Sequence, residues 1–439
     1  MSDQIYSSTV SDVESVQICV VGLGYVGLPL AYELDAEGHQ VWGYDVDPEK
    51  VDSLETGIDP TGDVGDANIA DSDVEFTTDA AAIEEAEYVI VAVPTPVDDL
   101  EKPDLGLVES AGQTVGEHIE PGTTAILEST VYPGATREVF VPAIEETSGL
   151  EAGDEFGVGY SPERMVPGDD EHGLRNVVKI VSGLTDETLA EVASLYESIV
   201  DAGVHRAPTI ETAEAAKCVE NTQRDLNIAL VNELAVACDH LGLDTEAVLE
   251  AAGTKWNFHD YRPGLVGGHC IPVDPFYLIY ETEQQGFSPE LIQKAREVNE
   301  YVPEHVAKQT IKALNESEKV LSNSRVLVLG LTYKPDVDDI RTSAIDGVIE
   351  TLKEYDIDVV GFDPHADDDQ MREEFGIDVQ EELDVTDFDG LIVGTPHSQF
   401  HGLNFSDLYY EMARDPVLVD VDGTFEEDAL ENEFTYRKL

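Results

Sequence analysis

Basic residues are scarce in this chain. Lysine and arginine number 24 among 439 residues, against 93 aspartates and glutamates, and the formal net charge is -69 at pH 7. A surface of this charge repels nucleic acid and anionic lipid, so the composition argues against both as partners. The acids are spread along the chain, as in proteins of salt-loving organisms, and we therefore expect folding and activity to require molar salt.

Cysteine and long apolar runs are also scarce. The four cysteines, Cys19, Cys218, Cys238 and Cys270, have no CxxC or Cys/His spacing suited to zinc, so we expect reduced thiols and no metal. No apolar run has the length that spans a bilayer, and no basic start precedes a hydrophobic stretch. These absences predict a cytoplasmic protein without a membrane partner.

Short apolar runs mark the first half of the chain. Two of them, at residues 16–21 and 40–45, flank a glycine turn and a helical segment. Four more runs follow, at 88–93, 124–127, 158–160 and 178–182. Continuous apolar runs between helical or polar segments are typical of strands in a parallel sheet. The pattern predicts a doubly wound α/β domain over residues 1–205.

The pattern changes twice after that domain. From residue 210, apolar residues recur at helical spacing without proline until Gly242, which predicts one helix of about 30 residues that bridges domains or subunits. From residue 324, apolar runs return in "RVLVLG", "DVVGF", "GLIVG" and "PVLVDV". We therefore predict two Rossmann-like doubly wound parallel-sheet domains joined by a long central helix. The helical domain covers residues 206–315, and the second Rossmann-like domain covers 316–439.

The first turn, "GLGYVG", has the GxGxxG spacing of a dinucleotide site. Gly22 allows a sharp turn, Gly24 lets the backbone approach a pyrophosphate, and Gly27 permits close packing of the helix. Asp45 closes the next strand near the spacing of the acid that binds an adenosine ribose, and an acid there favours NAD over NADP. The alternative is a structural glycine turn in a domain that binds no nucleotide.

Two proline-containing loops, "AVPTP" and "ESTVYPG", follow later strands of the same domain. Ligands of open α/β sheets bind beyond the carboxyl ends of the strands, so we expect both loops to face the cofactor. Thr95 and Thr130 of these loops complete the predicted cofactor-binding residues, together with Tyr25 and Val26 of the glycine turn.

Two polar pairs are candidates for catalysis. Glu163 and Arg164 lie in the loop "GYSPERMVPG", and a glutamate in a cleft can act as acid or base. Lys217 and Asn221 are four residues apart on the predicted helix and share a face, where the lysine could stabilise an oxyanion. The ordinary alternatives are a surface glutamate and a snorkelling lysine.

The segment "LVGGHCIPVDPFYL" contains the one cysteine that falls in a loop. The other three fall on predicted strand or helix positions, where a free cysteine is usually a small buried hydrophobe. Cys270 instead follows two glycines, and Asp274 and a proline fix the exit of the loop. Metal ligation is disfavoured, because the adjacent His269 and Cys270 cannot easily serve one ion. The choice that remains is between a buried filler and a nucleophile.

Together these segments resemble the UDP-glucose/GDP-mannose dehydrogenase family. The resemblance rests on "GLGYVG", "AVPTP", "ESTVYPG", "SPERMVPG", "EAAKCVENTQRDLNIALVNELA", "LVGGHCIPVDPFYL" and "LGLTYKPDVDDIRTSA", in this order over nearly the whole chain. The helix and cysteine segments are most similar to the branch that oxidises UDP-N-acetylhexosamines. The glucose-oxidising branch has GGSC and a lysine before the aspartate. Here His269 and Val273 stand instead, which disfavours UDP-glucose.

The resemblance implies a four-electron oxidation of a sugar C6 alcohol to a carboxylate, with two NAD+ and no release of the aldehyde. Cys270 is then the nucleophile that forms a thiohemiacetal and a thioester, which water cleaves. By motif position Asp274 acts with a water as base and Lys217 holds the oxyanion beside Asn221. Glu163 is expected to assist hydrolysis of the thioester.

The resemblance also implies contacts with the substrate. Lys334 and Arg341 match family positions that touch the nucleotide sugar, and both suit a diphosphate. The other expected substrate-binding residues are Arg164, Lys217, Asn221 and Gly267. The family often offers an arginine across a subunit boundary, and Lys255 and Arg262 both stay candidates for that role.

The expected protein is thus a cytoplasmic, NAD-dependent UDP-N-acetylhexosamine 6-dehydrogenase acting on UDP-GlcNAc or UDP-GalNAc, with its product used in a polysaccharide. We expect a homodimer along the long helix, or a higher oligomer. One alternative is the same chemistry on UDP-N-acetylmannosamine or UDP-glucose. The others are a two-electron hydroxyacid or alcohol dehydrogenase with an inert Cys270, and a non-catalytic nucleotide-binding protein.

Overall fold

The computed structural model describes residues 15–98, 100–165 and 171–439. The chain forms two compact units, the first unit (Met1–Glu220 with Phe276–Phe287) and the second unit (Asn221–Pro275 with Ser288–Leu439). Helix α7 (Ile210–Leu241) carries the chain from the first unit into the second. The finer division into three domains, with boundaries after residues 205 and 315, stays a prediction.

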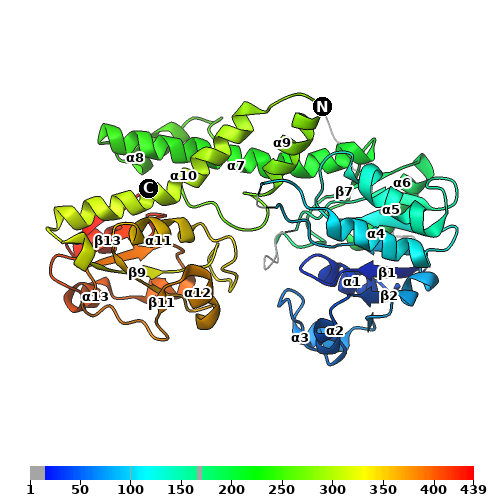
Figure 1. Cartoon of the computed structure of the whole chain (residues 1–439), viewed down its shortest axis with the longest axis horizontal. Coiled ribbons are helices and arrows are strands. Elements are labelled where there is room, and N and C mark those ends of the chain that lie inside the picture. Colours follow the sequence, from blue (N-terminus) through cyan, green and yellow to red (C-terminus); the bar gives the residue numbers. More distant parts are fainter. Residues whose placement is uncertain (1–14, 99, 166–170) are drawn as a thin grey trace. The chain divides into compact units, whose positions relative to one another are not determined.

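Within the described residues, the first unit contains an eight-stranded sheet of order β3-β2-β1-β4-β5-β6-β7-β8 (Figure 1). Neighbouring strands are parallel except β6 and β7. The strands are β1 (Gln17–Val21), β2 (Gln40–Tyr44), β3 (Glu75–Thr77), β4 (Tyr88–Val91), β5 (Thr124–Leu127), β6 (Gly157–Tyr160), β7 (Lys179–Gly183) and β8 (Val204–Arg206). The order reverses between β1 and β4, and ligands of such sheets bind at the carboxyl ends of strands beside this reversal.

The apolar runs account for most of these strands. The six predicted runs coincide with β1, β2, β4, β5, β6 and β7 to within two residues at each end. Ile18 and Val20 of β1 share one core with Ile90 of β4 and Ile126 of β5. Strands β3 and β8 were not predicted, because each has three residues and too few buried side chains to form an apolar run.

Helices pack on the first sheet, and α4 and α5 lie side by side (Figure 1). The helices before α7 are α1 (Gly27–Ala36), α2 (Pro48–Glu55), α3 (Asp66–Asp71), α4 (Gly106–His118), α5 (Val141–Ser148) and α6 (Asp186–Ile199), with a 3-10 helix η1 (Ala80–Glu85) and a π-helical turn η2 (Thr136–Phe140). Local capping fixes two of their starts. The Asp47 carboxylate accepts the N–H groups that open α2, and the Thr185 hydroxyl accepts that of Thr188 in α6.

The predicted long helix is confirmed. Helix α7 has 32 residues and ends before Gly242, whose φ of 69° is the left-handed conformation in which glycine ends helices. The next helices along the chain are α8 (Thr245–Gly253), α9 (Asp274–Gln284) and α10 (Glu290–Glu316). Among the helices of the described residues, none has both the length and the apolar character needed to cross a membrane.

The second unit contains a six-stranded sheet of order β11-β10-β9-β12-β13-β14, in which all neighbours are parallel. Its strands are β9 (Arg325–Leu329), β10 (Asp358–Phe362), β11 (Asp378–Val379), β12 (Gly390–Val393), β13 (Val417–Asp420) and β14 (Thr435–Lys438). Its helices are α11 (Ile345–Lys353), α12 (Asp368–Phe375), α13 (Phe405–Glu411) and α14 (Glu426–Glu431), with 3-10 helices η3 (Leu321–Asn323) and η4 (Ser398–Gly402). This sheet reverses between β9 and β12, so both predicted Rossmann-like sheets are confirmed.

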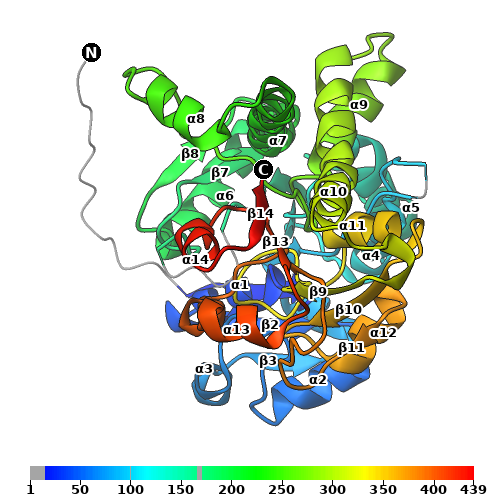
Figure 2. The same cartoon turned by 90° about the vertical axis from the view of Figure 1, so that its left-hand side faces the viewer.

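The central strand β9 shows why this sheet is covered on both faces. Val326 and Val328 lie in one core with residues of α10 and α11, and these two helices run side by side in Figure 2. Leu327 and Leu329 lie in a separate core with residues of α13. Successive strand side chains point to opposite faces, so a fully apolar strand needs a helical layer on each side.

Candidate active site

The glycine turn after β1 leaves no room for a side chain at two of its three glycine positions. Gly22 has a φ of 93°, and a Cβ there would lie 2.8 Å from the Ala92 carbonyl oxygen. A Cβ on Gly27 would lie 1.8 Å from the Gly22 carbonyl oxygen. A Cβ on Gly24 would meet nothing within 4 Å, so the space beside this backbone is open. The turn therefore fits a pyrophosphate at the start of α1.

Asp45 follows β2 and is buried. Its carboxylate accepts hydrogen bonds from the Leu23 N–H at 2.8 Å, the Asp47 N–H at 3.0 Å and the Lys50 Nζ at 2.8 Å. Burial raises the pKa of Asp45, but these three donors outweigh it and hold the pKa below its usual value. An ionised acceptor thus stands beside the glycine turn, where an adenosine ribose offers hydroxyl donors.

The loops after β4 and β5 are tied together. The Ser129 hydroxyl donates to the Val93 carbonyl at 2.6 Å and accepts the Val93 N–H at 3.1 Å. The Tyr277 hydroxyl donates to the Thr95 carbonyl. These contacts hold the segment of Thr95 against that of the half-buried Thr130, at the switch point of the sheet. Tyr25 and Val26 lie in the glycine turn, and the Tyr25 side chain is about half exposed.

Glu214 of α7 also holds the loop after β5 in place. Its carboxylate is fully buried and accepts the Gly134 N–H at 2.6 Å, the Thr136 N–H at 2.9 Å and the Thr136 hydroxyl at 2.6 Å. Burial nevertheless raises the pKa of Glu214 above its usual value. Sequence reasoning missed this residue, because nothing distinguishes one helical glutamate among so many.

Glu163 belongs to a buried cluster of charged residues. Its Oε2 lies 2.6 Å from the Lys179 Nζ, and its Oε1 accepts the N–H groups of Arg164 and Met165 at 2.6 Å each. Burial raises the pKa of Glu163, but Lys179 and the two N–H groups outweigh it and hold the pKa below its usual value. The carboxylate is therefore ionised, with both oxygens bound within the protein.

Lys179 also binds a second buried glutamate. Its Nζ lies 3.1 Å from the Glu128 Oε1, and the Tyr196 hydroxyl donates to the same oxygen. The Glu128 Oε2 is buried without a hydrogen-bond partner among the described residues. Burial raises the pKa of Glu128 to about 7, although Lys179 opposes the shift. A lysine inside an apolar strand of a lysine-poor chain was the available signal for this cluster, and sequence reasoning missed it.

Arg164 and Lys217, both predicted to bind substrate, also lie in the first unit. The Arg164 guanidinium forms a two-point pair with Glu220, with Nη2–Oε1 at 2.5 Å and Nε–Oε2 at 3.1 Å. Its Nη1 donates to the Val178 carbonyl. Lys217 is half-buried on α7, one helical turn before Asn221. In this structure the guanidinium of Arg164 is thus engaged within the protein.

The second unit brings three predicted catalytic residues together. The Asn221 amide donates to the Asp274 carboxylate at 2.5 Å, and both side chains are buried. The Asp274 N–H donates to the Cys270 carbonyl at 2.8 Å, so the cysteine loop runs directly into α9. Cys270 itself is exposed, in contrast to the other three cysteines, which are buried. The buried-filler interpretation of Cys270 is therefore wrong.

The glycines before Cys270 pack closely against the loop after β9. The Gly268 N–H donates to the Thr342 carbonyl at 3.2 Å, and a Cβ on Gly268 would lie 2.8 Å from the Tyr333 ring. His269 Nε2 lies 3.0 Å from the Asp339 Oδ2. The Arg341 Nε and Nη2 also donate to the Asp339 carboxylate, at 2.9 and 2.8 Å. Asp339, which sequence reasoning missed, thus joins the cysteine loop to a predicted substrate cation.

A small open pocket of about 50 Å³ lies at the carboxyl ends of β9, β12 and β13. It is lined by Leu265, Gly267, Thr332, Tyr333, Lys334, Pro335, Ser343, Ala344, Ile345, Gly394, Thr395, Pro396 and Asp422. Gly267 and Lys334 were predicted to bind substrate, and both are among these residues. The pocket lies beside the reversal between β9 and β12, where open α/β sheets bind their ligands.

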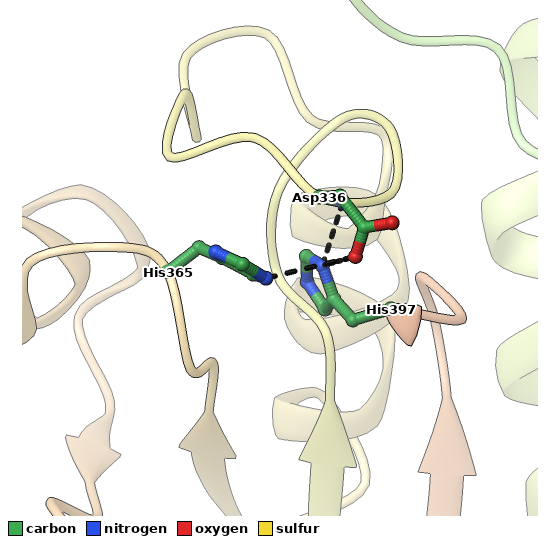
Figure 3. A group of neighbouring side chains, drawn as sticks. All are labelled: Asp336, His365 and His397. Carbon is green, nitrogen blue, oxygen red and sulfur yellow. Dashed lines mark hydrogen bonds and ion pairs between the residues drawn. The ribbon is translucent and has the colours of Figure 1, made fainter. Parts of the chain in front are cut away.

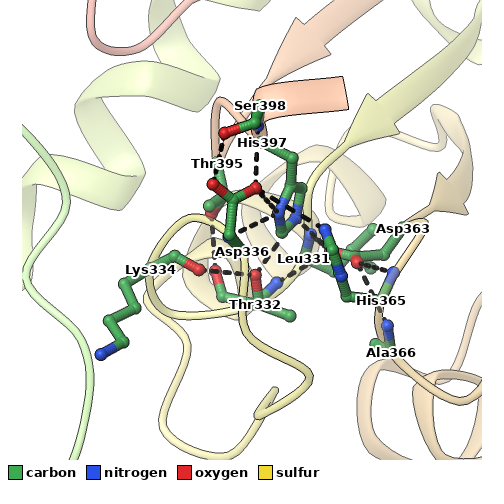
Figure 4. Close-up of polar contacts among 10 residues, drawn as sticks. All are labelled: Leu331, Thr332, Lys334, Asp336, Asp363, His365, Ala366, Thr395, His397 and Ser398. Carbon is green, nitrogen blue, oxygen red and sulfur yellow. Dashed lines mark hydrogen bonds and ion pairs between the residues drawn. The ribbon is translucent and has the colours of Figure 1, made fainter. Parts of the chain in front are cut away.

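Asp363 occupies in the second sheet the place that Asp45 has in the first, directly after the second strand. Five donors bind its carboxylate: the N–H groups of Leu331, Thr332, His365 and Ala366, and the His397 Nε2 (Figure 4). Burial raises the pKa of Asp363, but the donors outweigh it and lower the pKa below its usual value. Asp363 is therefore a brace for the loop after β9.

Asp336, His365 and His397 bring possible metal-ligand atoms within 4.8 Å of one another (Figure 3). The His397 Nδ1, however, accepts the Asp336 N–H at 2.9 Å, and its Nε2 donates to Asp363. The Asp336 carboxylate accepts the N–H and hydroxyl of Ser398. Because both His397 nitrogens are engaged in this way, His397 has no lone pair left for an ion. We therefore assign no metal to this group, which joins two loops.

Three segments of the chain match one protein family. Residues 16–200 match the NAD binding domain of the UDP-glucose/GDP-mannose dehydrogenase family, residues 211–301 its central domain and residues 327–427 its UDP binding domain. The glycine turn and Asp45 lie in the first match. The pocket with Lys334 lies almost wholly in the third.

Individual relatives match over nearly their full length. Protein CapL of Staphylococcus aureus is 43% identical over 94% of this chain and 97% of its own. The UDP-N-acetyl-D-glucosamine 6-dehydrogenase of Pseudomonas aeruginosa is 42% identical over 95% and 99%. The solved UDP-D-ManNAc dehydrogenase of Pyrococcus horikoshii superposes with a TM-score of 0.87 at 29% identity, over 96% and 98%. The chain therefore belongs to the UDP-glucose/GDP-mannose dehydrogenase family and is an NAD-dependent oxidoreductase that acts on a UDP-linked sugar.

Proposed function

We propose that this enzyme oxidises the C6 hydroxyl of a UDP-N-acetylhexosamine to the carboxylate through a thioester on Cys270. The observation that carries the proposal is the continuous loop from Gly267 to Cys270. Gly267 lines the pocket of the second unit, and three residues later the exposed Cys270 precedes the buried Asn221–Asp274 pair. A nucleotide held in that pocket is thus connected by a short loop to a thiol and a carboxylate.

The chemistry requires a covalent step. Bound NAD+ supplies the hydride acceptor, and two NAD+ are consumed for each sugar. The first oxidation takes a hydride and a proton from the alcohol and leaves an aldehyde. The Cys270 sulfur adds to that aldehyde to give a thiohemiacetal, which can lose a second hydride where the free aldehyde cannot. Water then breaks the thioester, releasing the carboxylate and restoring the thiol.

The surrounding residues have distinct roles in this proposal. Asp274, oriented by Asn221, removes the proton of the alcohol with the help of a water. Lys217 stabilises the oxyanion that each addition creates. Glu163 assists thioester hydrolysis, and its two bound oxygens indicate that it does so by orienting polar groups as an ionised carboxylate.

UDP-N-acetylglucosamine is the favoured substrate. The Pseudomonas aeruginosa relative that is named for this substrate is 42% identical. Relatives named for UDP-N-acetyl-D-mannosamine, such as that of Methanococcus maripaludis, are 32% identical or less. His269, which stands where the glucose-oxidising branch has serine, binds Asp339 and through it Arg341. Serine in place of His269 would therefore change the surroundings of Arg341, a predicted substrate-binding residue. This difference supports a substrate other than UDP-glucose.

Release of NADH from a panel of UDP-sugars tests the proposal. We expect UDP-N-acetylglucosamine or its C4 epimer to give two NADH for each sugar oxidised, with UDP-glucose and UDP-N-acetylmannosamine turned over at least about tenfold less efficiently. One NADH per substrate would support the two-electron dehydrogenase instead. Tight NAD binding without turnover of any nucleotide sugar would support a non-catalytic protein.

A homodimer along α7 also belongs to this proposal. Leu230, Leu234 and Leu241 recur at helical spacing on α7, and their side chains are exposed by 56%, 38% and 71%. A repeated apolar stripe on a long helix suits the same stripe of a second copy related by a twofold axis. Light scattering in molar KCl is expected to give twice the chain mass of 47.9 kDa or a higher multiple, and a Leu230→Asp, Leu234→Asp variant is expected to give the monomer mass.

A further inference from the structure

One acid lines the pocket of the second unit. Asp422 follows β13, and its carboxylate is open to the pocket. Gly264 packs closely against the Asp422 carboxylate, because a Cβ on Gly264 would lie 3.3 Å from the Asp422 Oδ1. Among the residues that the structure describes, none donates a hydrogen bond to this carboxylate and no cation pairs with it. The Asp422 side chain is exposed, so solvent reaches its carboxylate until a ligand fills the pocket.

The hydroxyl groups around Asp422 are already used. The Thr332 hydroxyl donates to the Lys334 carbonyl at 3.0 Å, and the Thr395 hydroxyl donates to the Thr332 carbonyl at 2.6 Å. Asp420 is fully buried, accepts the Phe425 N–H at 2.6 Å and adds a like charge near Asp422. Burial and Asp420 raise the pKa of Asp422 to about 6, so the carboxylate is still ionised above that pH. A ligand that displaces solvent from this carboxylate must itself supply a donor, because none of the described residues does.

The charge of the pocket restricts which part of a nucleotide can supply this donor. Lys334, which lines the same pocket, is the group that suits a diphosphate. A phosphate brought to Asp422 would face a like charge and would have no proton to donate. The uracil ring offers one N–H donor, whereas the ribose offers two neighbouring hydroxyl donors. Two carboxylate oxygens match two adjacent hydroxyl groups.

We propose that Asp422 binds the ribose of the UDP moiety by accepting hydrogen bonds from its 2′- and 3′-hydroxyl groups. This inference rests on the proposed function, because it assumes that the pocket holds UDP. It makes Asp422 a specificity-determining residue that distinguishes a ribonucleotide from a deoxyribonucleotide. Asp363, which has the position of Asp45 in the second sheet, already accepts five hydrogen bonds from the protein. Asp422 would therefore take the role of ribose acceptor in this sheet.

Calorimetric titration of the full-length enzyme with UDP, 2′-deoxy-UDP and 3-methyl-UDP tests the inference. A hydrogen bond to a charged group changes affinity by about tenfold or more. We therefore expect wild-type enzyme to bind UDP at least about tenfold more tightly than 2′-deoxy-UDP, and the D422A variant to bind both with equal affinity. The affinity for UDP is also expected to fall more steeply below pH 6 in wild-type enzyme than in D422N. Both lose affinity as the terminal phosphate of UDP takes a proton, but only the wild type also loses an ionised carboxylate.

The controls separate this role from folding and from the proposed function. D422N keeps the size of the side chain, and Glu427→Gln changes an exposed acid of the nearby α14, so both are expected to melt at the wild-type temperature. Retention of the UDP preference in D422A would overturn the inference, as would tighter UDP binding, which would place the carboxylate against the diphosphate. If wild-type enzyme binds UDP more tightly than 3-methyl-UDP and D422A does not, Asp422 binds the uracil N–H and not the ribose. Failure of wild-type enzyme to bind UDP would overturn the proposed function as well.

Discussion

The Asn221 amide donates a hydrogen bond to the Asp274 carboxylate over 2.5 Å, and both side chains are buried. The two residues are 53 positions apart in the sequence, on α7 and at the start of α9. A buried carboxylate needs donors, and the Asn221 amide supplies one of them. The amide therefore helps to hold Asp274 in place.

Replacing Asn221 by alanine is expected to lower kcat by about 10- to 100-fold, because a hydrogen bond to a charged group contributes about 1.5–3 kcal/mol. Since the loss concerns the orientation of Asp274, the KM for NAD should stay within about twofold. Steady-state kinetics with both substrates measure these values. Asn221→Ser, which keeps a donor, is expected to recover part of the rate. An unchanged pH profile and kcat in Asn221→Ala would remove Asn221 from the catalytic set.

Cys270→Ser is expected to abolish formation of the uronate and to spare binding of NAD. The exposed thiol contributes little to the core, so the variant should melt at the wild-type temperature. Product analysis by mass spectrometry and a fluorescence titration with NADH give the two readings. Cys238→Ala, at a buried cysteine of α7, is the control and should stay active. Wild-type production of the acid by Cys270→Ser would refute the thioester mechanism.

Lys179→Met is expected to lower the free energy of unfolding by about 3–5 kcal/mol, because it leaves two buried glutamates without their cation. Chemical denaturation at constant salt measures the change. Lys308→Met removes a lysine from an exposed pair with Glu304 and is expected to cost less than about 1 kcal/mol. Equal effects of the two substitutions would show that the buried cluster contributes no more than a surface pair.

Glu128→Gln should stabilise the protein increasingly as the pH rises. Burial raises the pKa of Glu128 to about 7 in the folded state, against a usual value of 4.5. Between these values the folded state holds a proton that the unfolded state has lost, so wild-type stability falls as the pH rises through this window. The stability of Glu128→Gln relative to wild type is therefore expected to grow from about pH 4.5 to about pH 7 and then to level off. Denaturant midpoints measured at half-unit intervals would show a flat difference if Glu128 ionised normally.

Asp45→Ala is expected to raise the KM for NAD by about 10- to 100-fold, because it removes an ionised acceptor beside the glycine turn. The KM for the UDP-sugar should change by less than about twofold, since the pocket with Lys334 is formed by other residues. Glu55→Gln, at the far end of α2, is the matched control. Unchanged affinity for NAD in Asp45→Ala would exclude Asp45 from the cofactor site.

Most of the fold followed from local patterns. Six strands of the first sheet are apolar runs of four or five residues, and α7 ends at the predicted glycine. The sequence did not reveal β3, β8 or the separate helix α10. A three-residue strand exists only through its pairing with a distant neighbour. Within α10, Pro303 interrupts the pattern that predicts a helix, although packing on the second sheet holds the helix together.

The sequence by itself determined the types of chemical group and their order: a glycine turn with a following acid, a lysine and an asparagine on one helix face, and a cysteine in a glycine-rich loop. These are local features, and their spacing is visible without a fold. Only the tertiary structure decided which groups are paired and which are open. Lys179 meets Glu163 and Glu128, and Asp339 meets His269, because packing brings together residues that lie far apart in the chain. Asp422 lines a pocket and meets no donor among the described residues. Burial among such neighbours sets their charge states, which no spacing in the sequence can express.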